Sequence, residues 1–373
     1  MKTQAAVLFK APGDWEVVEV DLAPPQQDEL LVRMGAAGLC HSDDHITSGD
    51  LPVPPGALPI AGGHEGAGTV IEVGPSTEGW RPGDKVVLSF LPMCGRCKWC
   101  ASGMQNLCDN GRDVLAGTRP DGSKRMSLDG RPLGQGAGVS TFSQYSTVSV
   151  KSAVKIPADI PIDVAALTSC GVSTGWGAAV NSAEVRPGHV VIVEGVGGIG
   201  MNAVQGAAHA GATVVIAVDP VAFKRDSSFA FGATHAVATM DEATEIARGY
   251  TNGQGADSAI VCVGSTTPEQ VAAGVRAIRK AGICVMVGMG AMADDTAIPV
   301  SVREMVLYQK RLQGSLFGAS SPARDIPAML DLYRQGRLKL DELITTRYPL
   351  TQINQGYQDM RDGRNIRGII TFD

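Results

Sequence analysis

The sequence predicts an α/β protein of two domains, one rich in β-strands and one built on a doubly wound parallel sheet. Its 373 residues suit two domains at roughly 150 residues each. Over roughly the first 170 residues, short apolar runs are separated by Pro, Gly and Asp turn signals. From about Val172 onward, strand-like and helix-like segments alternate, which is typical of a parallel sheet covered by helices on both faces.

The β-rich domain is expected to comprise residues 1–171 and 315–373. The strand pattern recurs in residues 5–9, 30–34, 68–73, 85–90 and 367–372. Arg81 to Asp84 has the residues of a turn, and residues 120–131 those of a surface hairpin. Residues 326–335 have the pattern of a helix.

The doubly wound domain, residues 172–314, is expected to be inserted between these two parts. Its predicted strands are residues 190–193, 213–218, 258–263 and 283–287. Its predicted helices are residues 200–209, 223–231 and 269–279.

The composition excludes several classes of protein. Apolar residues make up 44% and charged residues 19%, which excludes a disordered chain and allows two buried cores. The 32 Lys and Arg against 38 Asp and Glu leave a formal charge of −6, so nucleic acid is not an expected partner. No stretch approaches 18 uninterrupted apolar residues, so no membrane span is expected.

We expect the protein to be cytoplasmic. Its N-terminal residues, 1–15, lack the continuous apolar run of a signal peptide. The eight cysteines are therefore interpreted as thiols or metal ligands rather than as four disulfides.

A glycine-rich loop after the strand 190–193 predicts a dinucleotide-binding site. Gly195, Gly197 and Gly200 form G-x-G-x-x-G, with Gly198 and Ile199 between the last two, and a helix follows at once. The glycines allow the turn, the approach of a pyrophosphate and close packing of the helix on the strand. Asp219, 19 residues beyond Gly200 at the end of the next strand, is placed for a ribose 2′-hydroxyl. A carboxylate repels a 2′-phosphate, which favours NAD over NADP.

Four cysteines in one short segment predict a metal site. Cys94, Cys97, Cys100 and Cys108 are spaced C-x2-C-x2-C-x7-C. Four thiolates this close in sequence can surround Zn²⁺ without help from the rest of the fold. Two disulfides or an iron–sulfur cluster are the alternatives, because bacterial ferredoxins use a similar run with a different final spacing. A closed site of this kind holds a loop and does no chemistry.

A second group of candidate ligands is dispersed: Cys40, His64 and Cys170. Taken singly, they have ordinary explanations as a packed thiol, a hydrogen-bonded loop histidine and a small buried residue. Their neighbours favour a shared site: Cys40 is followed by the run 41–45 (HSDDH), His64 by Glu65, and Cys170 by the run 171–175 (GVSTG). Cys262 and Cys284, flanked by strand residues, are interpreted as core thiols.

Together these motifs resemble the zinc-containing medium-chain alcohol dehydrogenases over essentially the whole chain. The motifs are GLCHSD (38–43), GHEGAG (63–68), the four-cysteine segment, CGVSTG (170–175) and the glycine loop. Several stretches are similar to the nicotinoprotein branch, which is assayed with N,N-dimethyl-4-nitrosoaniline as an artificial acceptor. These are residues 200–207, 218–225, 338–345 and 356–360.

The resemblance implies a GroES-like catalytic domain beside a Rossmann domain, and two zinc ions per chain. Cys40, His64 and Cys170 would hold the catalytic zinc with one position left for water or substrate, the ligand set that is known for alcohol dehydrogenases. The four-cysteine segment would hold a structural zinc. Ser42 would pass a proton from the substrate through the nicotinamide ribose to His45. Asp43 would fix the ring of His64, and Glu65 would approach the zinc during ligand exchange.

The resemblance also assigns residues around substrate and cofactor. Phe90 falls where relatives line the substrate channel, although ordinary core packing also explains it. Many relatives have Arg where this chain has His41, and a histidine of ordinary pKa is mostly neutral at pH 7. Phosphate binding would then depend more on Arg367, which corresponds to a pyrophosphate contact. The other implied contacts are Lys224 for the adenosine ribose, and Thr174, Val287, Leu316 and Phe317 for the nicotinamide.

The implied activity is oxidation of primary alcohols to aldehydes with NAD. The NAD would either exchange at each turnover or stay bound and be reoxidised by an external electron acceptor. A glutathione-dependent formaldehyde dehydrogenase is the alternative enzyme, and a catalytically silent NAD- and zinc-binding protein is the alternative of another class. Residues 297–302 are similar to the segment through which relatives dimerise, so a homodimer or homotetramer is expected.

Overall fold

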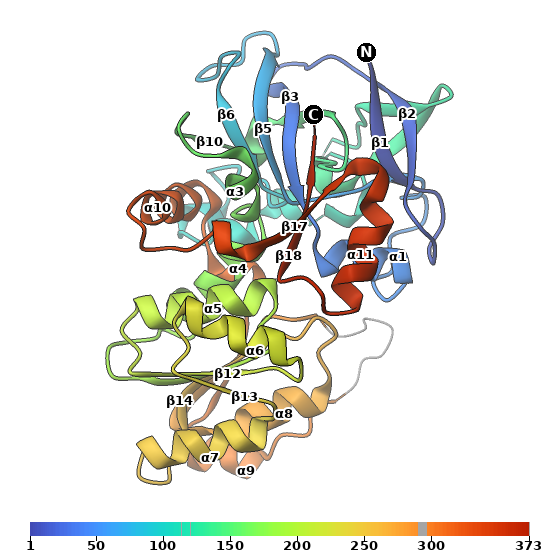
Figure 1. The fold of residues 1–373 in the computed structure, drawn as a ribbon. Coiled ribbons are helices and arrows are strands. Elements are labelled where there is room, and N and C mark those ends of the chain that lie inside the picture. The colour runs from blue at the N-terminus through green and yellow to red at the C-terminus, as the bar shows by residue number, and fades with distance from the viewer. Residues whose placement is uncertain (113, 120, 290–296, 373) are drawn as a thin grey trace. The chain divides into compact units, whose positions relative to one another are not determined.

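The computed structural model describes residues 1–112, 114–119, 121–289 and 297–372, and it divides into two compact units (Figure 1). Unit 1 comprises Met1–Cys170 and Ser321–Asp373, and unit 2 comprises Gly171–Ser320. Unit 1 is dominated by strands, and unit 2 alternates strands and helices. The predicted α/β fold with one β-rich and one doubly wound domain is therefore confirmed.

Unit 1 contains a closed barrel and an open sheet. The barrel strands, in order, are β1 (Lys2–Leu8), β2 (Glu16–Leu22), β7 (Met126–Leu128), β8 (Arg131–Gln135) and β4 (Ile60–Ala61). The open sheet has the order β10 (Ala153–Ile156), β6 (Lys85–Leu88), β5 (Gly66–Val73), β3 (Glu29–Gly38), β18 (Arg367–Thr371) and β17 (Ile344–Pro349). A further strand, β9 (Tyr145–Ser149), also pairs with β3.

Strands β3 and β5 are the framework on which the helices of unit 1 are placed. Strand β3 is almost entirely buried and pairs with β5, β9 and β18, so the residues that follow it are held at a defined position. The helices of this unit are α1 (His41–Ser48), α2 (Lys98–Ala101), α3 (Ile162–Leu167), α10 (Pro322–Arg334) and α11 (Ile353–Arg361).

Unit 2 is a six-stranded sheet in which every neighbouring pair is parallel. Its order is β13 (His235–Val237), β12 (Val214–Val218), β11 (Val190–Glu194), β14 (Ala256–Val261), β15 (Ile278–Met286) and β16 (Arg311–Gly314). Its helices are α4 (Gly171–Gly177), α5 (Gly198–His209), α6 (Ala222–Ser228), α7 (Met240–Tyr250), α8 (Pro268–Ala277) and α9 (Val302–Leu307).

The strand order of unit 2 reverses direction at β11. From β11 the chain proceeds to β12 and β13 on one side, and later to β14, β15 and β16 on the other. In sheets of this topology, ligands bind beyond the carboxyl ends of the strands at the point of reversal. The loop between β11 and α5 lies at that point. Within the described residues, no helix has the length and apolar character that crossing a membrane requires.

Candidate active site

Three side chains that are distant in sequence converge in the interior of unit 1. Cys40 immediately precedes α1, His64 lies between β4 and β5, and Cys170 follows α3. One ligand atom from each lies within 4.8 Å of those of the other two, and all three residues are buried. This is the set predicted to hold a catalytic metal.

Local backbone features bring the three segments together. The amide of Gly66, two residues after His64, donates to the Ser169 hydroxyl at 2.9 Å, which joins the start of β5 to the residue before Cys170. Gly63 has a φ of +87°, and a Cβ there would lie 2.6 Å from the Phe142 amide. A larger residue at position 63 would therefore displace the histidine loop.

Asp43, on the first turn of α1, orients the imidazole of His64. A carboxylate oxygen of Asp43 lies 2.9 Å from Nδ1 of His64, and both side chains are buried. The contact leaves Nε2 for the side facing the two sulfurs, which is the usual arrangement of a histidine metal ligand. Burial alone would lower the pKa of His64, but the Asp43 carboxylate and the Cys40 sulfur outweigh it and hold that pKa well above its ordinary value.

The two thiols of the cluster have opposite pKa shifts. A hydrogen bond from the Cys170 thiol holds the pKa of Cys40 well below its ordinary value, although burial opposes this. The same hydrogen bond, with burial, raises the pKa of Cys170. Negative charge therefore collects on Cys40, and positive charge is favoured on His64. An electrostatic environment of this kind also stabilises a bound metal cation.

Helix α1 presents the predicted proton-transfer residues. Oγ of Ser42 lies 3.7 Å from Sγ of Cys40, so the hydroxyl borders the metal cluster. His45 follows Ser42 by three residues, which places both on one side of the helix. The His45 side chain is buried, and its Nδ1 lies 3.4 Å from an Asp50 carboxylate oxygen. His41 is exposed, with its ring 6.4 Å from that of His45.

Glu65 and Arg367 form a buried ion pair with each other. The sequence assigned Glu65 to the metal and Arg367 to a pyrophosphate, and it did not foresee their pairing. Adding a Cβ at Gly38 would collide with the Glu65 carboxyl group, so the glycine makes room for the pair. Nε of Arg367 has no hydrogen-bond partner among the described residues.

Phe90 lies against a metal ligand and borders a cavity. Its ring meets that of His64 edge to face, with centroids 5.4 Å apart. Phe90 also lines a cavity of about 410 Å³. The wall of this cavity combines apolar side chains such as Pro92 and Val114 with charged ones such as Arg96 and Lys151.

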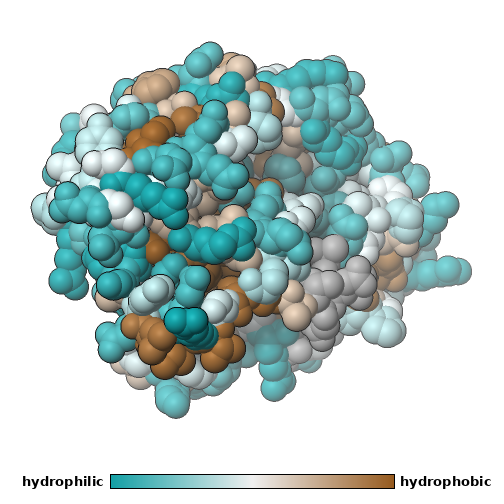
Figure 2. Space-filling model, turned by 90° about the horizontal axis from the view of Figure 1, so that it is seen from below, coloured by the Kyte–Doolittle hydropathy of each residue, from teal (hydrophilic) through white to brown (hydrophobic). Residues whose placement is uncertain are grey.

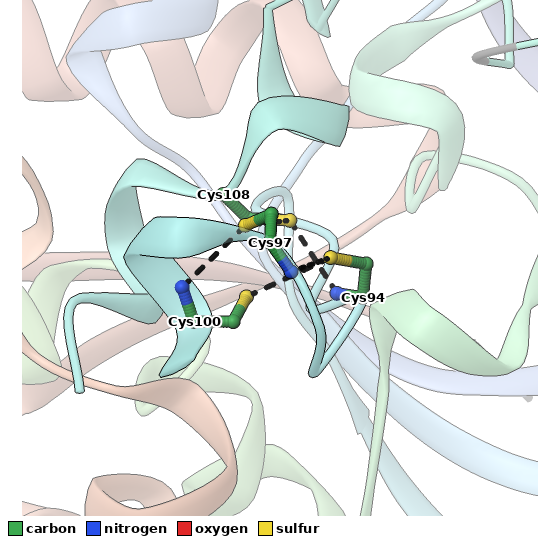
Figure 3. A group of neighbouring side chains, drawn as sticks. All are labelled: Cys94, Cys97, Cys100 and Cys108. Carbon is green, nitrogen blue, oxygen red and sulfur yellow. Dashed lines mark hydrogen bonds between the residues drawn. The ribbon is translucent and has the colours of Figure 1, made fainter. Parts of the chain in front are cut away.

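The four-cysteine segment folds into a compact cluster around α2 (Figure 3). The sulfurs of Cys94 and Cys100 are 3.9 Å apart, and those of Cys97 and Cys108 are 4.0 Å apart. A tetrahedron of Zn–S bonds of about 2.3 Å has edges of about 3.8 Å, so these separations fit one zinc ion. All eight cysteines of the chain are free in this structure.

Backbone amides prepare two of these cysteines to be thiolates. The amides of Cys97, Cys100 and Cys94 donate to the sulfurs of Cys94, Cys97 and Cys108 at 3.3–3.4 Å. Hydrogen bonds from the amides of Arg96 and Cys97 lower the pKa of Cys94 to about 6. The amide of Cys100 lowers the pKa of Cys97 in the same way. Burial raises the pKa of Cys100 to about 12 and also raises that of Cys108.

The glycine loop of unit 2 has the geometry that its sequence predicts. Gly195 has a φ of +81°, a backbone conformation that favours glycine. Gly197 is the N-cap of α5, and a Cβ there would meet nothing within 4 Å. At Gly200, by contrast, a Cβ would collide with the Gly195 carbonyl. Gly198 and Ile199 form the first turn of α5, where backbone amides have no partner within the helix.

Asp219 follows β12 and is 5% exposed. Its carboxylate accepts the amides of Val196 at 3.1 Å and Val221 at 2.9 Å, which fixes the carboxylate beside the glycine loop. Lys224 lies on α6 and is half-buried. Arg225, which the sequence analysis did not single out, donates to the carbonyls of Asp219 and Pro220 at 2.8 and 2.9 Å.

The residues assigned to the nicotinamide come from neighbouring elements of unit 2. Val287 directly follows β15, and Leu316 lies two residues beyond β16. The Ser315 amide donates to the Met286 carbonyl at 2.9 Å, which joins the two strand ends. Phe317 is buried and has a φ of +55°. The carbonyl of Thr174, on α4, lies close to Gly318.

Comparison with known proteins identifies the family. Residues 26–158 match the model of the alcohol dehydrogenase GroES-like domain, and residues 198–335 match that of a zinc-binding dehydrogenase. The chain is 49% identical to putative alcohol dehydrogenase D of Mycobacterium tuberculosis over 99% of this chain and 100% of that protein. The chain belongs to the zinc-containing medium-chain alcohol dehydrogenases.

Two further relatives of this alcohol dehydrogenase are similar over its whole length. It is 48% identical to the NDMA-dependent alcohol dehydrogenase of Amycolatopsis methanolica over 99% of each chain. NDMA is N,N-dimethyl-4-nitrosoaniline, so the predicted resemblance to the branch assayed with this dye is confirmed. The crystal structure of benzyl alcohol dehydrogenase from Acinetobacter calcoaceticus superimposes with a TM-score of 0.91 over the full length of both chains at 30% identity. The protein is an enzyme, as predicted.

Proposed function

We propose that this alcohol dehydrogenase converts primary alcohols to aldehydes, reversibly, with hydride passing to NAD and with two zinc ions per chain. The observation that carries the proposal is the convergence of Cys40, His64 and Cys170 into one buried cluster. Two sulfurs and one imidazole supply three ligands of a tetrahedral site, and the fourth position is available to substrate. Bound there, zinc would act as a Lewis acid that lowers the pKa of the alcohol hydroxyl.

The residues around the cluster orient one ligand and transfer the proton of the alcohol. Asp43 holds the His64 ring in the tautomer that ligates through Nε2. Ser42 takes the proton of the alcohol hydroxyl, since its own hydroxyl lies beside Cys40. His45, on the same side of α1 and next to Asp50, carries that proton toward solvent. Glu65 and Arg367, which pair with each other, place one charge of each sign near the metal ligands.

Phe90 orients the carbon chain of the substrate in this proposal. Its ring packs on that of His64, so an alcohol at the metal site meets an aromatic surface. Phe90 also lines a cavity of about 410 Å³, a volume within the roughly 300–1,000 Å³ that small-molecule sites span.

The glycine loop and Asp219 support NAD as the cofactor. NAD would supply the nicotinamide ring that accepts the hydride. Its pyrophosphate is matched by the free amides of α5, and its adenosine ribose by the carboxylate of Asp219. Arg225 lies nearby, but its guanidinium already donates to two carbonyls. We therefore expect NAD to bind more tightly than NADP.

The NAD is proposed to stay bound and to be reoxidised by an external electron acceptor. The 48% identity to an NDMA-dependent alcohol dehydrogenase supports this mode. Freshly purified enzyme should then show nicotinamide absorbance and should reduce the nitrosoaniline dye without added NAD. Turnover that requires added NAD would contradict retention. Formaldehyde oxidation that requires glutathione would instead select the alternative enzyme.

A homodimer is proposed on the exposed side of α9. Val302, Val306, Leu307 and Tyr308 are between 42% and 76% exposed, and β16 ends the sheet of unit 2 with one edge unpaired among the described strands. Figure 2, which views the molecule from the side on which α9 lies in Figure 1, shows hydrophobic side chains gathered at the surface. A second copy would cover such a patch. A monomeric mass in light scattering would contradict the homodimer.

The expected cytoplasmic location is a separate proposal, and cell fractionation tests it.

Metal and cofactor analysis of the freshly purified enzyme is the central test. We expect about two zinc ions per chain, one for each cluster, and NAD released on denaturation. Iron instead of zinc would overturn the assignment of the clusters. A protein with zinc but without alcohol oxidation would support the catalytically silent alternative.

A further inference from the structure

Glu194 lies in unit 2, next to the glycine loop, and takes no part in the proposed chemistry. It is the last residue of β11 and directly precedes Gly195 of the glycine loop. Side chains alternate along a strand, and Val190 and Ile192 belong to the hydrophobic cluster that includes residues of α7 and α8. Glu194 therefore points to the α7 and α8 face of the sheet.

The Glu194 side chain is half-buried, and one oxygen of its carboxyl group lacks a partner in the described part of the chain. Its Oε2 is enclosed and has no hydrogen-bond partner among the described residues. Burial raises the pKa of Glu194 to about 7. Buried polar atoms of native proteins nearly always have a partner, so an unpaired one at a binding loop indicates a missing ligand or water.

The expected path of NAD brings its adenine to the same face. The pyrophosphate lies at the N-terminus of α5, and Asp219 marks the adenosine ribose. Helix α5 packs on the other face of β11, away from the hydrophobic cluster of α7 and α8. By the same alternation, Val191 and Val193 point toward α5. The base attached to the ribose is thus left with the α7 and α8 face. There the half-buried Val237 and Val263 adjoin the cluster and offer apolar walls for a flat ring.

We propose that Glu194 binds the adenine of NAD as a neutral carboxylic acid, its carbonyl accepting from the exocyclic amino group and its hydroxyl donating to a ring nitrogen. Side-chain amides pair with adenine in this two-bond manner, and a protonated carboxyl has the same donor and acceptor arrangement. An ionised carboxylate has lost the donor. The proposal rests on the proposed use of NAD, and it makes Glu194 a cofactor-positioning residue of this chain.

Other titratable groups near Glu194 do not explain a pH-dependent contact to adenine. Burial, and after it the nearby Glu194 carboxylate, raises the pKa of the Cys262 and Cys284 thiols, so they stay neutral. Asp219, at the end of β12, is held by two amides. The charged residues of α7 and α8 are exposed: Asp241, Glu242, Glu245, Arg248, Glu269 and Arg276.

The test is calorimetric titration of NAD into enzyme freed of bound dinucleotide, between pH 6 and pH 9. The variants are Glu194→Gln, a neutral isostere, and Glu194→Leu, which has neither donor nor acceptor. Glu269→Gln is the control, since it removes an exposed carboxylate from α8. Loss of a two-bond contact to a base should weaken NAD binding by about tenfold to a hundredfold in Glu194→Leu.

The pH profile separates this role from a structural one. Because the neutral acid binds, the NAD affinity of the wild type should fall by about tenfold per pH unit once the pH exceeds the pKa of free Glu194. Glu194→Gln should keep the low-pH affinity throughout the range, and Glu269→Gln should follow the wild type. A wild-type affinity that is independent of pH, or a Glu194→Gln profile that equals it, would overturn the proposal.

An adenine analogue locates the contact. In 1,N6-etheno-NAD, the amino nitrogen carries no hydrogen, so wild type should bind it about tenfold or more weakly than NAD. Glu194→Leu should bind both equally, and a retained preference for NAD would contradict the inference. If Glu194→Leu does not fold, the pH profile of Glu194→Gln decides. Failure of the wild type to bind NAD at any pH would instead refute the proposed function.

Discussion

The two cysteine clusters of this enzyme differ in how they are assembled. The four-cysteine cluster comes from one segment of the chain, 94–108, and backbone amides of that segment bond to its sulfurs. The cluster of Cys40, His64 and Cys170 draws on three segments and is fully buried. Its ligands are held by distant groups such as Ser169, which bonds to the start of β5.

This difference indicates which cluster can bind substrate during turnover. Four thiolates fill the coordination of one zinc ion, so the local cluster has no position for substrate. The dispersed cluster has three candidate protein ligands and lies next to a hydroxyl and an aromatic ring. Assembly from several elements makes this possible, because each element contributes one group to a common point. We therefore expect damage to the dispersed cluster to affect chemistry and damage to the local cluster to affect stability.

The largest effect is expected for Cys170→Ala. Loss of one of three ligands should lower kcat by about a thousandfold or more, since the zinc would supply several kcal/mol of charge stabilisation. Zinc content should fall from about two ions to about one per chain, while calorimetry should show NAD binding largely unchanged. Cys284→Ala, at another buried cysteine, is the control. Unchanged turnover of Cys170→Ala would refute the catalytic assignment.

A smaller effect on chemistry, but a clear one on stability, is expected for Cys97→Ser. The local cluster should lose its zinc, and a loss of about 3 kcal/mol would lower the Tm by roughly 6–12 °C. Scanning calorimetry measures this shift. The fraction that remains folded should keep most of its specific activity. A normal Tm together with lost turnover would reverse the roles that we give to the two clusters.

Asp43→Asn tests how strongly the dispersed cluster depends on its surroundings. The amide can present an NH₂ to Nδ1 of His64 and loses the negative charge, so zinc affinity should fall by about 10–100-fold. Competition with a chromophoric chelator measures this. Asp44→Asn is a matched control, since the neighbouring Asp44 is also buried but pairs with Arg361. Equal losses in both variants would show that α1, and not the histidine contact, was disturbed.

The smallest effect on turnover is expected from gentle treatment with an organomercurial at pH 7. Cys94 and Cys97 are half-buried, and their pKa values are lowered, that of Cys94 to about 6. They should react before the buried Cys40 and Cys170. Release of the first zinc should then lower turnover by less than about twofold, because the local cluster does no chemistry. Turnover lost in proportion to the first zinc released would contradict the distinction between the clusters.

Much of unit 2 could be predicted because its signals are local. The glycine loop needs a positive φ at Gly195 and close packing at Gly200, and only glycine meets both requirements. The strands β11, β12 and β14 have about the expected length. Strand β15 begins at Ile278, five residues before the strand predicted at 283–287. Helix α7 was missed although Thr239 and Glu242 form a capping box at its start, a signal that the sequence does contain.

The contacts between distant polar residues were harder to foresee. Glu65 and Arg367 are 302 positions apart, and their pairing depends on β18 lying beside β3. Arg225 turns back to the carbonyls after β12, which no spacing rule indicates. The enclosed, unpartnered Oε2 of the half-buried Glu194 likewise depends on how the sheet of unit 2 packs against its helices.

The sequence alone determined the alternation of strands and helices, the glycine loop and the ligand spacing of the four-cysteine segment, because these depend on neighbours within a few positions. The tertiary structure decided which distant side chains meet. Whether Cys40, His64 and Cys170 surround one point, which group orients His64, and which carboxyl groups are left paired or unpaired all follow from how β3, β5 and α3 pack. Burial then sets the charge of each group, since a pKa depends on the desolvation and the partners that packing creates.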